Sequence, residues 1–417
     1  KAKSKVKSKT EVKMTESFCV LPWVNITVDP DGAIKPCCIS HDYIKKEDGT
    51  KYNLGYDSID DIYNSKDFVD LRQKMLDNEY ISGCDVCYHN EKYGRQSRRL
   101  INNEQYKDVV PTTTESNLKI KFFDLRFGNL CNLKCRMCNP ANSNQIAKEI
   151  TEINNEEYSK FYPLFDLDSE EWWETDTFDE NIKSQVDNID TIYMTGGEPT
   201  VIEKNFDIMG ELIELDKSKD ITLIINTNLT NTNNRFYQYL PNFKSVILQL
   251  SIDGYEGVQE YLRYPSRFSQ IDESIHKLIE MENVKLWATP VIQIGNLNKI
   301  VDLFKYFEDI NMKANKALID IRPIILQDPQ HLNIDYLPKD FKLKAYAGIH
   351  MWMLGCKFQS QIFKDTINAL RKRCQQETKD INMLKEYIQF NDLLDKHRGQ
   401  TLADCNYNLH TLLKEYD

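Results

Sequence analysis

The sequence Cys131-Asn-Leu-Lys-Cys135-Arg-Met-Cys138 places three thiols on one short loop, with gaps of three and then two residues. The loop follows a short apolar run, 120–123, that is typical of a β-strand. Three soft thiolates can hold three corners of a four-iron cubane and leave the fourth iron without a protein ligand. A zinc site completed by a ligand from elsewhere in the chain, or a fortuitous trio, is the alternative interpretation.

Apolar runs of strand length alternate with amphipathic stretches over residues 118–330. The runs are 120–123, 191–194, 221–225, 246–250, 284–291 and 317–325. Strands that alternate with helices indicate parallel βα units. We therefore predict an α/β fold built on a partial barrel of six strand–helix units, similar to a TIM barrel.

Polar and glycine residues follow four of the predicted strands, at the ends where a parallel barrel carries its chemistry. They are the three thiols, Gly196-Gly197-Glu198-Pro199, Asn226-Thr227-Asn228 and Ser251-Ile252-Asp253-Gly254. We expect these four strand ends to converge on one site. No acid or base for proton transfer stands out among them.

A second group of cysteines precedes the predicted barrel, in a turn-rich segment. Its members are Cys19, Cys37, Cys38, Cys84 and Cys87. Residues 24–34 indicate a β-hairpin, and residues 58–78 have the periodicity of a helix. Four thiolates can surround a metal completely, and their spacing alone favours zinc. The other cysteines indicate buried apolar side chains, with a further cluster as the alternative: Cys356, Cys374 and Cys405.

The thiol spacing resembles the signature of the radical S-adenosylmethionine (radical SAM) superfamily, and the strand-end motifs extend this resemblance. Gly196-Gly197-Glu198-Pro199 resembles the GGEP motif, whose backbone and glutamate bind the methionine amino group. Ser251 and Asp253 resemble the motif near the ribose and the methionine carboxylate, and Asn228 resembles a further ribose contact. Arg263 matches a position that pairs with that carboxylate, although an arginine on a surface helix is the alternative.

This resemblance implies an oxidoreductase or modifying enzyme with a 4Fe-4S cluster on Cys131, Cys135 and Cys138. In that family S-adenosylmethionine (SAM) chelates the open iron, and an electron from the cluster cleaves SAM to a 5'-deoxyadenosyl radical. The radical then removes hydrogen from a substrate. Flavodoxin or ferredoxin is the usual electron donor, so we expect such a partner here.

Residues 15–117 resemble the SPASM or twitch domain, which holds an auxiliary 4Fe-4S cluster in radical SAM enzymes. The ligands that the resemblance implies are Cys19, Cys37, Cys84 and Cys87, with Cys38 in reserve. The domain precedes the predicted barrel here, whereas SPASM domains normally follow it. Four ligands leave no open iron, which favours electron transfer, whereas three would let a substrate bind the cluster.

We expect four segments along the chain. They are a disordered basic tail (1–14), the auxiliary-cluster domain (15–117), the barrel (118–330) and a helical C-terminal region (331–417). An acidic and aromatic insert at 150–188 is predicted to pack its aromatic side chains on the outside of the barrel. A lid that faces the substrate is the alternative for this insert.

The composition excludes some classes of partner. The formal net charge of −11 argues against broad nucleic-acid binding, which depends on clustered Lys and Arg. No apolar run approaches the roughly 18 residues that a membrane-spanning helix needs. We therefore expect a cytoplasmic protein without a membrane partner.

The substrate is predicted by analogy alone. Related SPASM and twitch enzymes often oxidise or crosslink peptides and proteins, so we expect a peptide or protein substrate. Modification of a nucleoside, a sugar or another small metabolite is the alternative reaction. A different class altogether is an iron-sulfur scaffold that has lost catalysis, but the intact cysteines and GGEP motif argue against it.

Overall fold

The computed structural model describes residues 17–92, 96–114, 119–162 and 171–416. The basic tail predicted at 1–14 lies outside these residues. The chain divides into two compact units, residues 1–124 with 172–189 and residues 125–171 with 190–417. The division between the N-terminal unit and the barrel therefore falls after residue 124, whereas we expected it after residue 117.

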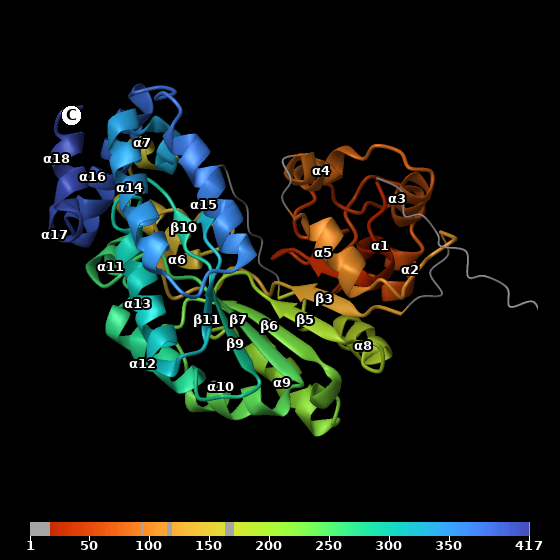
Figure 1. Ribbon diagram of the computed structural model, residues 1–417. Coiled ribbons are helices and arrows are strands. Elements are labelled where there is room, and N and C mark those ends of the chain that lie inside the picture. The colour runs from red at the N-terminus through yellow and green to blue at the C-terminus, as the bar shows by residue number, and fades with distance from the viewer. Residues whose placement is uncertain (1–16, 93–95, 115–118, 163–170, 417) are drawn as a thin grey trace, which may run out of the picture. The chain divides into compact units, whose positions relative to one another are not determined.

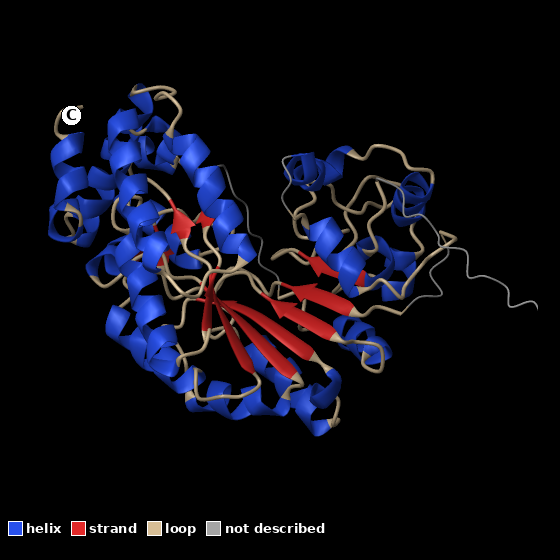
Figure 2. Ribbon diagram, in the orientation of Figure 1, coloured by secondary structure: helices blue, strands red, loops and turns tan. Residues whose placement is uncertain are grey.

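The first unit combines a small sheet with short helices (Figures 1 and 2). β1 (Asn25–Val28) pairs antiparallel with β2 (Ile34–Lys35), as predicted for the hairpin, and parallel with β3 (Phe122–Leu125). The helices are α1 (Leu21–Val24), α2 (Ile59–Tyr63), α3 (Lys66–Leu76), α4 (Asp85–Lys92), α5 (Arg98–Gln105) and α8 (Asp176–Gln185), with a 3-10 turn at Ser82–Cys84.

The helix predicted over 58–78 is two helices, α2 and α3. The Ser58 hydroxyl accepts a hydrogen bond from the Asp61 backbone N–H, and the Ser65 hydroxyl accepts one from the Phe68 N–H. A serine at this position satisfies a backbone donor that the first turn of a helix leaves unpaired. Ser65 therefore begins a second helix inside the predicted one.

Residues 172–189 belong to the first unit, and the prediction that their aromatic side chains pack on the outside of the barrel is wrong. Trp172 is buried, and its indole N–H donates to the Pro30 carbonyl at 3.0 Å. The Thr175 hydroxyl donates to the Gly55 carbonyl at 2.7 Å. The aromatic pattern correctly indicated a buried face, but it did not indicate the partner.

The second unit contains a parallel sheet in the order β5-β6-β7-β9-β11. Its strands are β5 (Thr191–Met194), β6 (Thr222–Thr227), β7 (Ser245–Leu250), β9 (Val284–Ala288) and β11 (Ile319–Ile321). Every second side chain of β6 and of β7 is buried. Of the side chains on the other face, Asn226 of β6 and Gln249 of β7 line a cavity. Helices cover the opposite face of the sheet (Figure 1). The predicted α/β fold with mostly parallel strands is confirmed.

Two predicted strands are each interrupted by a proline. The run 284–291 breaks at Pro290 into β9 and β10 (Val291–Ile292), and the run 317–325 breaks at Pro323 into β11 and β12 (Ile324–Ile325). Proline has no N–H to donate within a sheet, so the main ladder ends there. β10 and β12 then pair with each other in parallel.

Helices complete the second unit. Those of the barrel region are α6 (Asn144–Ile153), α7 (Glu156–Ser159), α9 (Glu203–Glu214), α10 (Asn234–Tyr239), α11 (Gly257–Leu262), α12 (Phe268–Leu278) and α13 (Ile300–Ala314). The predicted C-terminal helical region is confirmed as α14 (Lys339–Gly355), α15 (Gln361–Cys374), α16 (Asn382–Arg398), α17 (Leu402–Cys405) and α18 (Tyr407–Leu413). Over the described ranges, none of the helices has the length and apolar character to cross a membrane.

Trp172→Ala is expected to destabilise the first unit by about 3–5 kcal/mol, because the change leaves a cavity and removes the donor to the Pro30 carbonyl. Hydrogen exchange of the β1 amides in the full chain, followed by mass spectrometry, measures this loss. Trp173→Ala is the matched control, since Trp173 is only partly buried, and should have a much smaller effect. Equal effects of the two substitutions would contradict the assignment of this segment to the first unit.

Candidate SAM and cluster site

One cavity of about 710 Å³ lies at the carboxyl ends of β5, β6 and β7. The predicted site residues on its wall are Cys131, Cys135, Cys138, Gly196, Gly197, Glu198, Asn228, Ser251 and Arg263. The predicted strand ends therefore converge on one site. Asp253 is the exception, because it is fully buried and is not among the residues that line the cavity.

The Gly196-Gly197 turn lies directly against the chain that leads into the thiol loop. Both glycines have positive φ, +80° and +49°. A Cβ at Gly197 would lie 2.2 Å from the Leu130 carbonyl oxygen, and the Glu198 N–H donates to the same oxygen at 2.9 Å. Only glycine permits this approach. The contact with the thiol loop therefore requires glycine at position 197.

The Glu198 carboxylate ties the end of β5 to the end of β6. It accepts hydrogen bonds from the Thr200 and Thr227 hydroxyls, each at 2.7 Å, and from the Asn228 N–H at 2.7 Å. Burial raises the pKa of Glu198, while these donors act in the opposite direction. The carboxylate therefore fixes the shape of the cavity wall.

Asn228 connects the end of β6 to the thiol loop. Its side-chain amide donates to the Asn132 side-chain oxygen at 3.0 Å, and the Asn132 amide donates to the Thr230 hydroxyl at 2.8 Å. Asn132 could not be identified from the sequence, because a single asparagine between two cysteines carries no signal of its own. This network leaves the Asn228 side chain engaged with the protein at the edge of the cavity.

Arg263 lies beside the second thiol. β4 (Lys134–Cys135) pairs antiparallel with β8 (Arg263–Tyr264), and this pairing sets Cys135 opposite Arg263. The Arg263 Nε donates to the Asp253 carboxylate at 2.6 Å, and another guanidinium nitrogen lies 3.8 Å from the Cys135 Sγ. Arg263 is thus a buried residue of a strand and not a surface helix residue, and Asp253 holds it in place.

Burial raises the pKa of all three thiols of the loop, and for Cys138 the pKa reaches about 12. For Cys131 and Cys138 the neighbouring Cys135 adds to this effect, whereas Arg263 favours the thiolate form of Cys135. Buried thiolates of this kind need a cation beside them, and metal ligation releases their protons. Two buried thiols and the partly buried Cys138, next to a guanidinium, therefore fit a cluster with an anionic ligand beside it.

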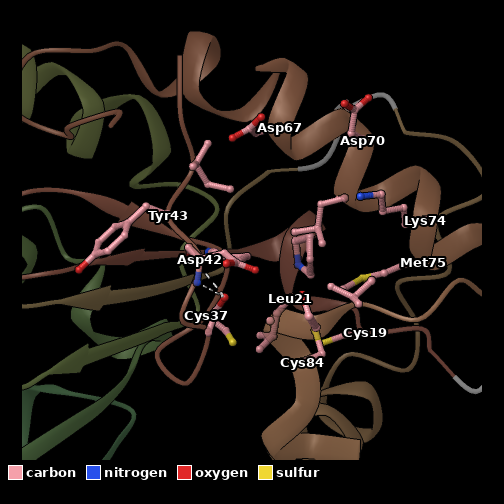
Figure 3. A pocket seen from close by; sticks show the side chains of 18 of the residues that line it. Cys19, Leu21, Cys37, Asp42, Tyr43, Asp67, Asp70, Lys74, Met75 and Cys84 are labelled. Carbon is pink, nitrogen blue, oxygen red and sulfur yellow. Dashed lines mark hydrogen bonds between the residues drawn. The ribbon is translucent and has the colours of Figure 1, made fainter. Parts of the chain in front are cut away.

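The first unit holds the second group of thiols. Cys19, Cys37 and Cys84 line a cavity of about 290 Å³, and Figure 3 shows their sulfur atoms at one end of it. Burial raises the pKa of Cys19, and charges on Cys37, Cys84 and Cys87 add to that rise. Burial likewise raises the pKa of Cys37 and Cys84 to about 11. Cys37 lines this cavity and its charge acts on Cys19, which favours Cys37 over the adjacent Cys38 as the ligand. Cys87 is buried, and its charge also acts on Cys19.

Helix α5 fixes the backbone on both sides of Cys19. The Arg99 guanidinium donates to the Phe18 carbonyl at 2.8 Å, and the Asn103 side-chain oxygen accepts from the Val20 N–H at 2.8 Å. Backbone groups that are buried in a loop need such partners. Arg99 is buried, and it has this structural role.

Neither thiol group is arranged around a single ion. Among the residues that the structure describes, no group of three or more His, Cys, Asp or Glu side chains could hold one metal ion. In a cubane each cysteine ligates a different iron, so its sulfur ligands lie farther apart than those around one ion.

Comparisons with known proteins identify the family. Residues 125–306 match the radical SAM superfamily, and residues 19–88 match SPASM, described as an iron-sulfur cluster-binding domain. No curated protein matches the chain. The two matches together give the domain combination of enzymes that use SAM with iron-sulfur clusters. The chain therefore contains a radical SAM domain, and a SPASM domain precedes it. These domains imply SAM, a 4Fe-4S cluster in the barrel and an auxiliary iron-sulfur cluster as cofactors.

Several solved structures of radical SAM enzymes share weak similarity with the chain. Streptococcus suis SuiB bound to S-adenosylmethionine is 12% identical with a TM-score of 0.37, over 71% of this chain and 60% of that chain. SuiB bound to precursor peptide SuiA is 11% identical with a TM-score of 0.35, over 69% and 64%. The methyltransferase TsrM from Kitasatospora setae is 11% identical with a TM-score of 0.27, over 35% and 30%. At these values the substrates of these enzymes do not transfer to this chain.

Cys37→Ser is expected to abolish binding of the auxiliary cluster, whereas Cys38→Ser should retain it, because Cys37 lines one cavity with Cys19 and Cys84 and its charge acts on Cys19. The measurement is iron content after anaerobic reconstitution of the full chain, with Cys131, Cys135 and Cys138 replaced by alanine so that only the auxiliary cluster is counted. Loss of iron in the Cys38→Ser variant with retention in the Cys37→Ser variant would reverse the assignment.

Proposed function

We propose that this enzyme cleaves SAM reductively in the barrel cavity and abstracts hydrogen from a peptide or protein. The observation that carries the proposal is the single cavity lined by the three thiols of the loop, the Gly196-Gly197-Glu198 turn and Arg263. When bound there, the cluster and SAM supply the electron and the 5'-deoxyadenosyl radical for hydrogen abstraction. The cavity has the size of sites that enclose a cofactor-sized ligand.

The residues of the chain have distinct roles in this proposal. Arg263 pairs with the methionine carboxylate of SAM, while Asp253 holds the guanidinium from behind. The backbone of Gly196 and Gly197 binds the methionine amino group, with the Glu198 carboxylate fixing the turn. Ser251 lies where the resemblance puts the ribose, and its hydroxyl donates to the Asn226 side-chain oxygen at 3.0 Å.

The peptide or protein substrate rests on the analogy with other enzymes that combine the two domains. Complete ligation by Cys19, Cys37, Cys84 and Cys87 gives the auxiliary cluster a role in electron transfer rather than in substrate binding. A flavodoxin or a ferredoxin is the proposed electron donor. These assignments follow the family and not the geometry of the cavity.

Replacement of Cys131, Cys135 and Cys138 by alanine is expected to lower iron from about eight to about four atoms per chain and to abolish 5'-deoxyadenosine release, because only the auxiliary cluster remains. Iron analysis and chromatography after anaerobic incubation with SAM and dithionite measure both effects. Cys356→Ala, outside both thiol groups, is the control and should behave like the wild type.

Each deviation from this result has a definite meaning. Loss of all iron in the triple variant would contradict two separate clusters. Full iron without 5'-deoxyadenosine in the wild type would indicate a scaffold instead of an enzyme. Stimulation of release by nucleosides or sugars, and not by peptides, would replace the proposed substrate class.

A further inference from the structure

Arg136, the residue next to Cys135 in the thiol loop, extends from the loop to helix α16. Its side chain is 1% exposed. The guanidinium donates to the Asn391 side-chain oxygen at 2.7 Å and to the Asp395 carboxylate at 2.5 Å, both on α16. It also donates to the Tyr261 carbonyl at 2.9 Å and stacks on the Tyr261 ring at 3.6 Å.

The residue on the other side of Cys135 is connected to the same helix. The Lys134 ammonium lies 3.6 Å from the Glu149 carboxylate. Glu149 is fully buried and forms a bidentate pair with Arg398, the last residue of α16, at 2.9 and 2.6 Å. Helix α6, which carries Glu149, and helix α16 are both labelled in Figure 1.

Both neighbours of Cys135 are therefore connected to α16, Arg136 directly and Lys134 through Glu149 and Arg398. A buried charge is tolerated only where it is paired and hydrogen-bonded, so neither arginine can leave its partners without a large loss of stability. Cys131 has a different anchor. The Cys131 N–H donates to the side-chain oxygen of Asn144, the first residue of α6, at 3.1 Å.

We propose that helix α16 is a positioning element for Cys135, acting through Arg136 and through the Arg398–Glu149–Lys134 chain. The C-terminal helical region is thereby part of the cluster site, although it contributes no thiol to it. The effect of α16 on catalysis rests on the proposed role of Cys135 as a cluster ligand. The positioning of Cys135 by α16 does not depend on that role.

The test measures how often the loop opens around each thiol in the full chain without metal. Arg136→Gln is expected to raise the rate at which iodoacetamide alkylates Cys135 by about tenfold, because the bonds of a charged group to α16 are lost and local opening becomes easier. The alkylation rate of Cys131 should stay within about twofold, since its anchor is unchanged. Mass spectrometry resolves the two sites in one sample, and Lys385→Gln, an exposed change on α16, is the control.

A second variant keeps the test decisive if Arg136→Gln unfolds the chain. Asn391→Ala removes one acceptor on α16 and should raise the Cys135 rate by about threefold, with Cys131 unchanged. Equal increases at the two thiols in the Asn391→Ala variant, or no increase at Cys135 in either variant, would overturn the proposal. Failure of the proposed function would appear separately, as reconstituted wild type whose EPR spectrum does not change when SAM is added.

Discussion

The packing of the Gly196-Gly197 turn against the Leu130 carbonyl is the constraint on which the barrel site depends. Because neither glycine has a side chain, the thiol loop can lie directly on the end of β5, and the Glu198 carboxylate can reach the end of β6. The loop contains little regular structure of its own. The strand ends on one side and helix α16 on the other therefore fix its position. A change in the glycine turn acts on the whole loop, whereas a change in α16 acts mainly on Cys135.

Much of the site could be predicted from the sequence, because cysteine spacing and the Gly-Gly-Glu turn are specific for their chemistry and strand ends bring them together. The role of Asp253 could not be predicted. From the sequence, an aspartate in this motif could either contact a ligand or orient an arginine. Only the burial of Asp253 in the structure distinguishes the two roles. The contribution of Arg136 was hidden for a related reason, since its partners on α16 lie more than 250 residues further along the chain.

The fold shows the same division between local and distant information. Strand breaks at Pro290 and Pro323, and the helix start at Ser65, follow from the residue at the break itself, so a closer use of proline and capping rules would have found them. The position of residues 172–189 in the first unit follows from contacts with Pro30 and Gly55, far away in the sequence. Amphipathic patterns identify a buried face but do not identify what covers it.

The inclusion of residues 172–189 in the first unit also determines the order of events during biosynthesis. The ribosome makes all eight cysteines of the two groups before it makes the segment that completes the first unit. At about 5–20 residues per second, roughly 3–10 seconds pass between synthesis of Cys138 and of residue 189. The first unit is therefore completed only after the thiols of both groups have been synthesised.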